Sequence, residues 1–253
     1  MSATDSRSER PARPPHPVLP AYYSGEQDRR GFVREIFDNT AIDYEPVERL
    51  LSFGTGARYR RDALRRAGVA PGMRVLDVAT GTGLVAREAA ALVGNDGTVY
   101  GVDPSWGMLQ NAPRPGCTAL IQGTAEKLPF AKGEFDFVTV GFALRHLADL
   151  EGVFTEFHRV LRPGGGVCLL EITLPERAWL RNLLKLYMRR IAPLASRLVA
   201  RQADTPTLCR YYWDTIEACV APAEVIASLQ RVGFLQAHRH IEARCFSEYT
   251  AQR

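Results

Sequence analysis

The fold of this chain is decided by the stretch Val75-Leu76-Asp77-Val78-Ala79-Thr80-Gly81-Thr82-Gly83-Leu84-Val85-Ala86. Its first four residues form a short, mostly apolar run, which predicts a buried parallel strand. Gly81 and Gly83 interrupt this run, and a helical pattern follows from Leu84 to Val93. Glycines at such a turn let a ligand approach the backbone, and the amides at the start of the helix point toward it. The stretch therefore predicts a strand, a ligand-binding turn and a helix.

The residues that lead into the glycines indicate which ligand binds there. Residues 81–86 satisfy the relaxed pattern of dinucleotide-binding folds. However, Asp77 closes the strand and three residues separate it from Gly81, and a carboxylate at this place favours a cationic ligand and repels a pyrophosphate. The arrangement Asp-x-x-x-Gly-x-Gly resembles the first motif of the S-adenosylmethionine-dependent methyltransferases of the Rossmann-like class. An ordinary helix-entry turn is the alternative interpretation.

Length and composition set the broad class of the protein. A chain of 253 residues with 46% hydrophobic residues is expected to form one large α/β domain. The net charge of +4 is too small to indicate nucleic-acid binding. The five cysteines are scattered without a Cys-x-x-Cys pair, which argues against a metal site or a disulfide framework and favours a cytoplasmic location. No stretch approaches the length of a transmembrane helix.

The domain organisation follows from shifts in composition. Residues 1–25 are polar and rich in proline, which predicts a flexible tail or a partner-binding polyproline segment. Residues 26–253 are expected to form a single catalytic domain. Helical patterns at about 28–67 predict lid helices, and an insertion at about 175–219 is longer than a strand connection requires and predicts a helical cap over the substrate.

Strands and helices alternate after the glycine turn, which is typical of a parallel sheet with crossover helices. The second strand ends at Asp103, about twenty residues past the glycines, where a carboxylate can accept hydrogen bonds from ribose hydroxyls. With Pro104 behind it, Asp103 would also suit a helix cap, and the two roles are compatible. After the third strand, the small residues Thr124 and Ala125 form a turn over which an adenine could lie.

Two further blocks resemble a known family. The run Arg159-Val160-Leu161-Arg162-Pro163-Gly164-Gly165 before the fifth strand is a familiar hallmark of these methyltransferases. From about Phe32 to the C-terminus the chain resembles the ubiquinone/menaquinone C-methyltransferase family. The N-terminal signature of that family maps onto Tyr44, Glu48, Ser52-Phe53-Gly54 and Tyr59-Arg60, and its Phe-Gly-Leu-Arg-Asn block maps onto residues 142–146.

The resemblance implies a Rossmann-like α/β fold, with a seven-stranded, mostly parallel sheet, an antiparallel C-terminal strand and helices on both faces. It also implies S-adenosylmethionine as the cofactor and S-adenosylhomocysteine as its product. Motif and resemblance together give these candidate cofactor-binding residues: Tyr44, Ser52, Tyr59, Asp77, Gly81, Thr82, Gly83, Asp103, Pro104, Thr124, Ala125 and Gly141. Glu48 and His146 replace two asparagines of the family, and Tyr59 replaces a tryptophan, which leaves the quinol substrate open.

Three candidate catalytic residues follow the fourth and fifth strands. His146 is a candidate general base because an imidazole titrates near neutral pH, and a structural or substrate-positioning histidine is the alternative. Arg145 could stabilise a developing oxyanion or form an ordinary ion pair. Glu171 could orient His146, act as the base itself or serve only the structure. The other histidines, His16 among them, are expected to have surface or packing roles.

The insertion carries an apolar helical stripe with basic residues on another face. Such a stripe is usually core or a subunit contact, as in a homodimer, whereas its basic side would suit peripheral contact with an anionic membrane. The aromatic run at 211–213 could wall a substrate pocket or pack the insertion onto the sheet. The candidate substrate-binding residues are Phe142, Tyr187, Tyr211, Tyr212 and Trp213.

The sequence therefore predicts an S-adenosylmethionine-dependent methyltransferase that acts on a small hydroxylated aromatic, quinol-like or polyketide-like acceptor. Whether carbon or oxygen receives the methyl group stays open at this stage. A non-catalytic scaffold in a biosynthetic complex is one alternative, although it would not need the glycine turn and Asp103. A nicotinamide oxidoreductase is another, and Asp77 and the turn at 124–125 disfavour it.

Overall fold

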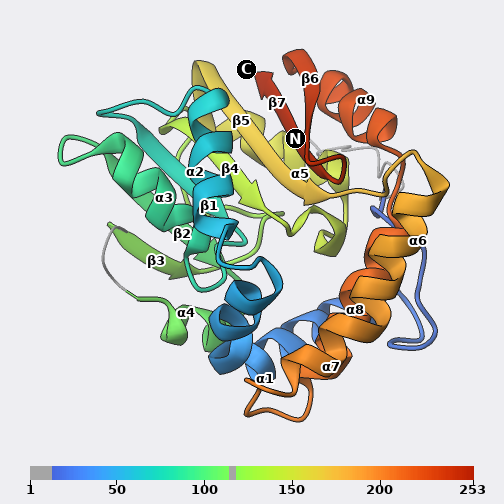
Figure 1. Cartoon of the computed structure of the whole chain (residues 1–253). Helices are drawn as coiled ribbons and strands as arrows, with labels where there is room; N and C mark the ends of the chain where they lie inside the picture. The colour runs from blue at the N-terminus through green and yellow to red at the C-terminus, as the bar shows by residue number, and fades with distance from the viewer. Residues whose placement is uncertain (1–12, 114–117) are drawn as a thin grey trace, which may run out of the picture.

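The computed structural model describes residues 13–113 and 118–253, which fold around a twisted sheet with helices on both faces (Figure 1). Within these residues the sheet has seven strands in the order β3-β2-β1-β4-β5-β7-β6. All neighbouring pairs from β3 to β5 are parallel, and β7 is antiparallel to both of its neighbours. The predicted α/β fold with an antiparallel C-terminal strand is thus confirmed. The strands are β1 (Arg74–Val78), β2 (Thr98–Asp103), β3 (Ala119–Gln122), β4 (Phe135–Gly141), β5 (Leu161–Ile172), β6 (Leu235–Glu242) and β7 (Phe246–Gln252).

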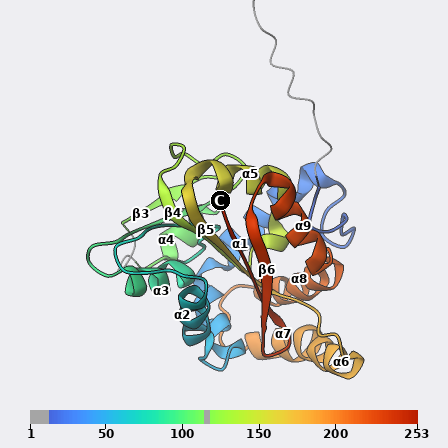
Figure 2. The same cartoon turned by 90° about the horizontal axis from the view of Figure 1, so that it is seen from above.

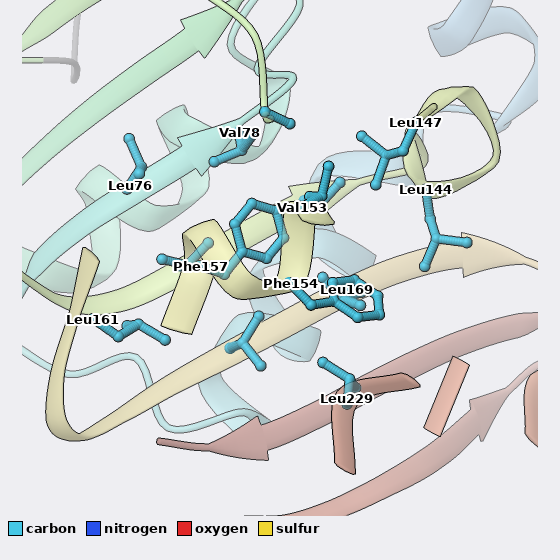
Figure 3. Packing of buried hydrophobic residues seen from close by; sticks show 14 of the residues in the cluster. Leu76, Val78, Leu144, Leu147, Val153, Phe154, Phe157, Leu161, Leu169 and Leu229 are labelled. Atoms are coloured by element: carbon cyan, nitrogen blue, oxygen red, sulfur yellow. The ribbon is translucent and has the colours of Figure 1, made fainter. Parts of the chain in front are cut away.

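Helices cover both faces of the central strands, and side chains that alternate along each strand pack on both sides. On β1, Leu76 and Val78 belong to one core cluster and Val75 to another. The first cluster lies under α5 (Leu150–Val160) and α9 (Pro222–Val232), and Figure 3 shows its side chains. The second lies under α2 (Gly56–Arg66) and α3 (Leu84–Val93). This two-sided burial explains the apolar strand segments in the sequence.

The fifth strand begins earlier than its sequence pattern predicts. The pattern places its start at Val167, whereas β5 already begins at Leu161 and includes the Arg-Pro-Gly-Gly-Gly run. A register shift against β4 lies between Phe135 and Phe137, so a bulge accommodates the extra residues.

The strand order reverses between β1 and β4, because the chain first runs outward through β2 and β3 and then returns to the other side of β1. Open α/β sheets bind ligands at the carboxyl ends of the strands beside such a point. The glycine turn that follows β1 and the segment that follows β4 both lie there. The topology therefore places the two main sequence motifs at one edge of the sheet.

A long N-terminal helix, α1 (Glu26–Leu51), contacts α4 (Trp106–Asn111) near this edge. The Asp38 carboxylate accepts hydrogen bonds from Ser105 Oγ (2.6 Å) and from the amide of Gly107 (2.8 Å). A Cβ at Gly107 would lie 2.8 Å from the Asp38 carbonyl oxygen, so glycine allows this close approach. The helix continues through Pro46. Helices α1 and α2 occupy the region where the sequence predicts lid helices.

The insertion between β5 and α9 is helical and lies beside α1 (Figures 1 and 2). Its Arg201–Thr205 loop is attached to the buried Asp43 of α1, whose carboxylate accepts hydrogen bonds from the amides of Arg201 and Gln202 and from Thr205 Oγ1 (2.7–3.0 Å). The elements of the insertion are α6 (Ala178–Leu186), the π-helical turn η2 (Tyr187–Ile191), α7 (Ala192–Ser196) and α8 (Thr205–Ala218).

The N-terminal segment differs from the flexible tail that the sequence suggests for 1–25. Residues 1–12 lie outside the described part, whereas residues 13–25 pack against the fold. The carbonyl of Arg13 accepts a hydrogen bond from the Leu150 amide (3.0 Å), and that of Pro15 accepts one from the Val220 amide (2.7 Å). Tyr23 packs into an apolar cluster with α1 and α8. The prolines at positions 14–20 therefore lie in a segment that packs against the fold.

Candidate active site

A cavity of about 350 Å³ lies at the carboxyl ends of the central strands. Its walls come from α1, the glycine turn, the end of β2, the turn after β3, the segment after β4, and α8. The following candidate residues from the sequence line it: Tyr44, Gly81, Asp103, Pro104, Thr124, Ala125, Gly141, Phe142, His146 and Tyr212. Among residues 13–113 and 118–253, no group of three His, Cys, Asp or Glu side chains is arranged to hold a metal ion.

The glycine turn presents bare backbone to this region. Gly81 and Gly83 have φ angles of 57° and 81°, and no atom lies within 4 Å of the place a Cβ would take on either residue. Ala79 and Phe142 also have positive φ angles, 54° and 59°, although they are not glycines. Such backbone costs on the order of 1 kcal/mol per residue and is concentrated at functional sites. Here it shapes the loops that follow β1 and β4.

Asp77 lies beneath the glycine turn with one carboxylate oxygen unpaired. Its Oδ2 accepts a hydrogen bond from Thr80 Oγ1 (2.6 Å), but Oδ1 is buried and accepts none from the described residues. Burial raises the pKa of Asp77 to about 7. The Thr82 hydroxyl is also buried, and it too bonds to none of the described residues. A cationic group with N–H donors, such as the ammonium of an amino acid, would satisfy Asp77.

Asp103 joins the end of β2 to the glycine turn. Its Oδ2 accepts a hydrogen bond from the Gly81 amide (2.8 Å), and Oδ1 accepts one from the Ser105 amide (2.8 Å). Ser105, not Asp103, is the N-cap of α4, since its hydroxyl accepts from the Met108 amide. Burial raises the pKa of Asp103 to about 6. Each carboxylate oxygen has a further lone pair, so the site fits a ribose, and with Asp77 it fits S-adenosylmethionine.

His146 ends the short helix η1 (Leu144–His146) and lies among aromatic rings. Its ring stacks on Tyr211 (centroids 5.3 Å apart, planes at 21°) and meets Phe37 edge-on (5.3 Å). Both ring nitrogens are buried, and neither bonds to a described residue. Burial, together with the positive charges of Arg145 and Arg29, lowers the pKa of His146 well below its usual value. The imidazole is therefore neutral at physiological pH and can accept a proton or a hydrogen bond.

Arg145 and Glu171 form a buried ion pair behind His146. The Arg145 guanidinium also donates hydrogen bonds to the Phe142 carbonyl (2.9 Å) and to Thr215 Oγ1 (3.1 Å). It lies 5.1 Å from the centre of the Tyr212 ring. Glu171 accepts hydrogen bonds from Arg145 and from the Ile172 amide rather than from His146. The pair thus connects the end of β5, the segment after β4 and α8.

The remaining candidates lie outside the cavity wall. Tyr59 packs between the rings of Phe142 and Phe246 (6.1 and 4.8 Å). Tyr187 donates a hydrogen bond to the Leu51 carbonyl (2.7 Å), and Trp213 is buried within the insertion with its Nε1 bonded to Glu217 (3.0 Å). Asp77, Thr82 and Gly83 lie at the glycine turn, Ser52 ends α1, and Tyr211 packs behind His146.

Three residues near His146 are missing from the sequence-based set. Phe37 lines the cavity, although its place on an amphipathic helix suggests only packing. Arg29 is buried and donates a hydrogen bond to the Arg145 carbonyl (2.9 Å); it also contacts His16 Nε2 (2.9 Å) and pairs with Glu26 (3.3 Å). Burial lowers the pKa of His16 to about 4, so this histidine is neutral beside the arginine. Arg29 and His16 are far from Arg145 and His146 in the sequence, so no local sequence pattern predicts these contacts.

Glu48, which stands where the resembled family has an asparagine, forms an ion pair with the buried Arg60 (2.9 Å). The Arg60 guanidinium lies 5.5 Å from the centre of the Phe142 ring. Its Nε and Nη1 donate to none of the described residues. The departure from the family pattern is therefore part of a charge pair next to the loop after β4.

Comparison with known proteins gives consistent results for sequence and fold. The model of the ubiE/COQ5 methyltransferase family matches residues 24–242. The chain is 38% identical to the demethylmenaquinone methyltransferase of Geobacillus kaustophilus over 184 residues, which cover 70% of this chain and 79% of the relative. It is 36% identical over 216 residues to the ubiquinone/menaquinone biosynthesis C-methyltransferase UbiE of Syntrophotalea carbinolica, covering 83% and 87%.

Solved structures share the fold at low sequence identity. One is a SAM-dependent methyltransferase from Thermotoga maritima, described as a possible histamine N-methyltransferase (TM-score 0.60, 17% identity, 86% of this chain and 98% of that chain). Another is a SAM-dependent methyltransferase from Aquifex aeolicus (TM-score 0.55, 20% identity, 76% and 88%). At these identities the likeness concerns the fold alone.

Proposed function

Because this chain belongs to the ubiE/COQ5 methyltransferase family, and so is an S-adenosylmethionine-dependent methyltransferase, we propose that its acceptor is a small hydroxylated aromatic of the quinol type. The observation that carries the proposal is the cavity wall beside His146. Rings of Phe37, Phe142 and Tyr212 line it, and the imidazole has two buried nitrogens with no partner among the described residues. Aromatic walls suit a flat ring, and the imidazole suits its hydroxyl group.

The residues around the glycine turn are proposed to hold the cofactor, which supplies an electrophilic methyl group and leaves as a thioether. Asp103 would accept hydrogen bonds from the ribose hydroxyls, and Asp77 would face the ammonium group. The turn at Thr124 and Ala125 would lie against the adenine. Arg30 of α1 and Glu126 form an ion pair at this turn (3.5 Å), so α1 closes over that part of the cavity and helps to exclude water.

His146 is proposed to take the hydroxyl proton of the acceptor. Because its pKa is low, the imidazole is always in the form that accepts a proton, although it is a weak base. Removal of that proton makes the aromatic ring more nucleophilic, so that a ring carbon can take the methyl group while the thioether leaves. Loss of the proton from that ring carbon and return of a proton to the oxygen then restore the aromatic quinol. The Arg145–Glu171 pair lies behind η1 and is proposed to position His146 and Tyr212 rather than to touch the acceptor. The relatives named as C-methyltransferases favour a ring carbon as the nucleophile.

Product analysis tests this proposal. The protein is incubated with S-adenosylmethionine and a panel of reduced naphthoquinols, benzoquinols and phenols, and the products are identified by mass spectrometry. A carbon-methylated quinol keeps both hydroxyl groups and can be reoxidised to a quinone, whereas a methoxy product cannot. We expect carbon methylation of a quinol. Methylation of oxygen alone, or no product although calorimetry shows S-adenosylhomocysteine binding, would overturn the proposed acceptor chemistry.

A further inference from the structure

The outward side of the insertion is unusually apolar. Twelve large hydrophobic side chains are exposed in the described residues, and seven of them lie between residues 179 and 199. Single exposed apolar side chains are normal on a protein surface, but such a concentration marks an interaction site. The seven residues, with their exposed fractions, are Trp179 (61%), Leu183 (55%), Leu186 (53%), Ile191 (47%), Leu194 (65%), Leu198 (83%) and Val199 (37%), and we call them the cap face.

The inner side of the same helices is packed, so the cap face belongs to an ordered unit. Met188 is buried in a cluster with Trp213 and Ile216 of α8. Tyr187 is attached to the end of α1 by its hydrogen bond to Leu51. In Figures 1 and 2, α6 lies at the periphery of the molecule. The apolar side chains of the cap face therefore point away from the fold because the opposite side of the helices packs against it.

The turn between α1 and α2 continues this surface. Phe53 is 83% exposed, and its ring lies 6.5 Å from that of Tyr187. Its φ angle is 51°, a backbone conformation that residues with a Cβ rarely adopt. The chain thus keeps a large aromatic side chain exposed beside the cap face although its backbone conformation is unfavourable.

The segment that carries the cap face is also strongly basic. Residues 177–202 contain seven arginines and lysines and neither aspartate nor glutamate. Lys185 pairs with Glu217 (2.7 Å) and Arg189 with Asp214 (3.6 Å), both on α8. The other five basic side chains form no ion pair within the described part of the chain. They are Arg177, Arg181, Arg190, Arg197 and Arg201.

We propose that the cap face docks onto an anionic lipid bilayer. Exposed leucines and a tryptophan beside unpaired basic residues match the two layers that such a surface offers, anionic headgroups and acyl chains. A second copy of this chain fits less well, because a two-fold interface would set the same seven basic residues against their counterparts. The proposal goes beyond the methyl transfer described above and does not depend on the identity of the acceptor.

Vesicle flotation of the full chain tests the docking. We expect the protein to float with vesicles of phosphatidylcholine and phosphatidylglycerol and to bind vesicles of phosphatidylcholine alone at least tenfold more weakly. Binding to the anionic vesicles should weaken as salt is added, because salt screens the basic residues. Equal binding to both vesicle types, or none to either, would overturn the proposal.

Substitutions locate the contact. Leu194→Ser and Leu198→Ser should each lower the vesicle partition coefficient by about tenfold, as expected for the loss of one buried leucine. Leu235→Ser is the matched control, since Leu235 lies on β6 and is as exposed as Leu194, at 65%. Arg190→Gln with Arg197→Gln should also weaken binding, whereas Arg58→Gln on α2, where the side chain is 89% exposed, should not.

The same variants distinguish the other occupant of this face. Thermal unfolding would first show that each variant is folded. Sedimentation then measures the oligomeric state without lipid. A dimer that Leu198→Ser dissociates, in a protein that binds no vesicles, would assign the cap face to a second copy and overturn the bilayer proposal. Equal losses of vesicle binding in Leu194→Ser and Leu235→Ser would show that the contact lies elsewhere.

Discussion

The central sheet and the helical insertion are stabilised in different ways. In the sheet, β4 buries six of its seven residues, and both faces pack against helices. In the insertion, every residue of α6 is at least partly exposed, and the unit is attached to α1 by polar contacts at Asp43 and Tyr187 and by one apolar cluster that includes α8. The sheet therefore sets the geometry of the glycine turn, while the insertion adds only Tyr212 to the cavity wall and presents its outer surface to solvent.

This difference suggests separate tasks for the two regions. Local opening costs least where few apolar contacts are made and most in the core of a sheet. Substitutions in the sheet should thus change chemistry or global stability, and substitutions in the insertion should act locally.

The largest effect is expected at the sheet edge, from His146→Ala. Loss of a positioned general base should lower kcat by about 10²–10⁴-fold, with an unchanged Kd for S-adenosylhomocysteine. Steady-state kinetics and calorimetry measure the two quantities. His146→Asn introduces the family residue and keeps a hydrogen-bonding side chain, while His240→Ala on β6 is the control. If the asparagine variant turns over at the original rate, His146 does not act as the base.

The second largest difference between the sheet and the insertion is expected in the free energy of unfolding. Phe157 is fully buried under the sheet, so Phe157→Ala should lower the free energy of unfolding by about 3–5 kcal/mol. Leu198 is 83% exposed, and Leu198→Ala should change it by less than about 0.5 kcal/mol. Chemical denaturation gives both values. Similar losses in the two variants would mean that the insertion is as tightly packed as the sheet.

A smaller, local effect is expected from Asp43→Ala. The substitution removes the acceptor of the hydrogen bonds from Arg201, Gln202 and Thr205. Because Arg201 and Gln202 are exposed, water can replace Asp43 as the partner of their amides, and the total cost should be about 1.5–3 kcal/mol. Hydrogen exchange should become faster around residues 197–205 and stay unchanged in β4. Asp96→Ala, at an exposed position, is the control. Faster exchange throughout the sheet would contradict the separation of the two regions.

The smallest effect concerns pH. If Asp77 faces the ammonium group of S-adenosylhomocysteine as proposed above, ligand binding favours the ionised form of this carboxyl group, whose pKa without ligand is raised to about 7 by burial. Below that value binding must first remove a proton, so affinity should rise with pH, by up to about tenfold per unit, and level off above pH 7. Asp103, with a pKa of about 6, adds the same trend at lower pH. The charge of Arg60 lowers the pKa of Asp77 and so partly offsets the effect of burial.

Calorimetry from pH 5.5 to 8.5 would measure this dependence. In Asp77→Asn the rise between about pH 6 and 7 should disappear, and the affinity should be lower at pH 8. An affinity that falls as pH increases would show that the ligand prefers the protonated carboxyl group.

Local patterns predict the sheet and the glycine turn because both depend on neighbours in sequence. The first strand, which ends at Val78 and not at Asp77, is one residue longer than predicted. The second strand ending at Asp103, the helix from Leu84 to Val93 and the antiparallel last strand agree with the structure. Burial on both faces of a parallel sheet gives each strand its apolar run, so the signal is strong.

Contacts between distant segments carry no such signal. Arg29 reaches the carbonyl of Arg145, 116 residues away, and no periodicity reveals this. The aromatic run at 211–213 gives a second reason. Successive residues of a helix point about 100° apart, so Tyr212 lines the cavity while Trp213 packs on Met188. Sequence alone cannot tell which of the aromatic residues faces the acceptor.

The π-helical turn Tyr187–Ile191 has a consequence for the alignment of the insertion. In an uninterrupted α-helix, Ile191 would be rotated by about 120° from Trp179, and the two halves of the exposed row would face different directions. A π turn takes up one more residue and turns the second half back into line. Deletion of a single residue from the π-helical turn would rotate the two halves of the cap face apart and leave its composition nearly unchanged. The π-helical turn therefore keeps the cap-face side chains before and after it on the same side of the insertion.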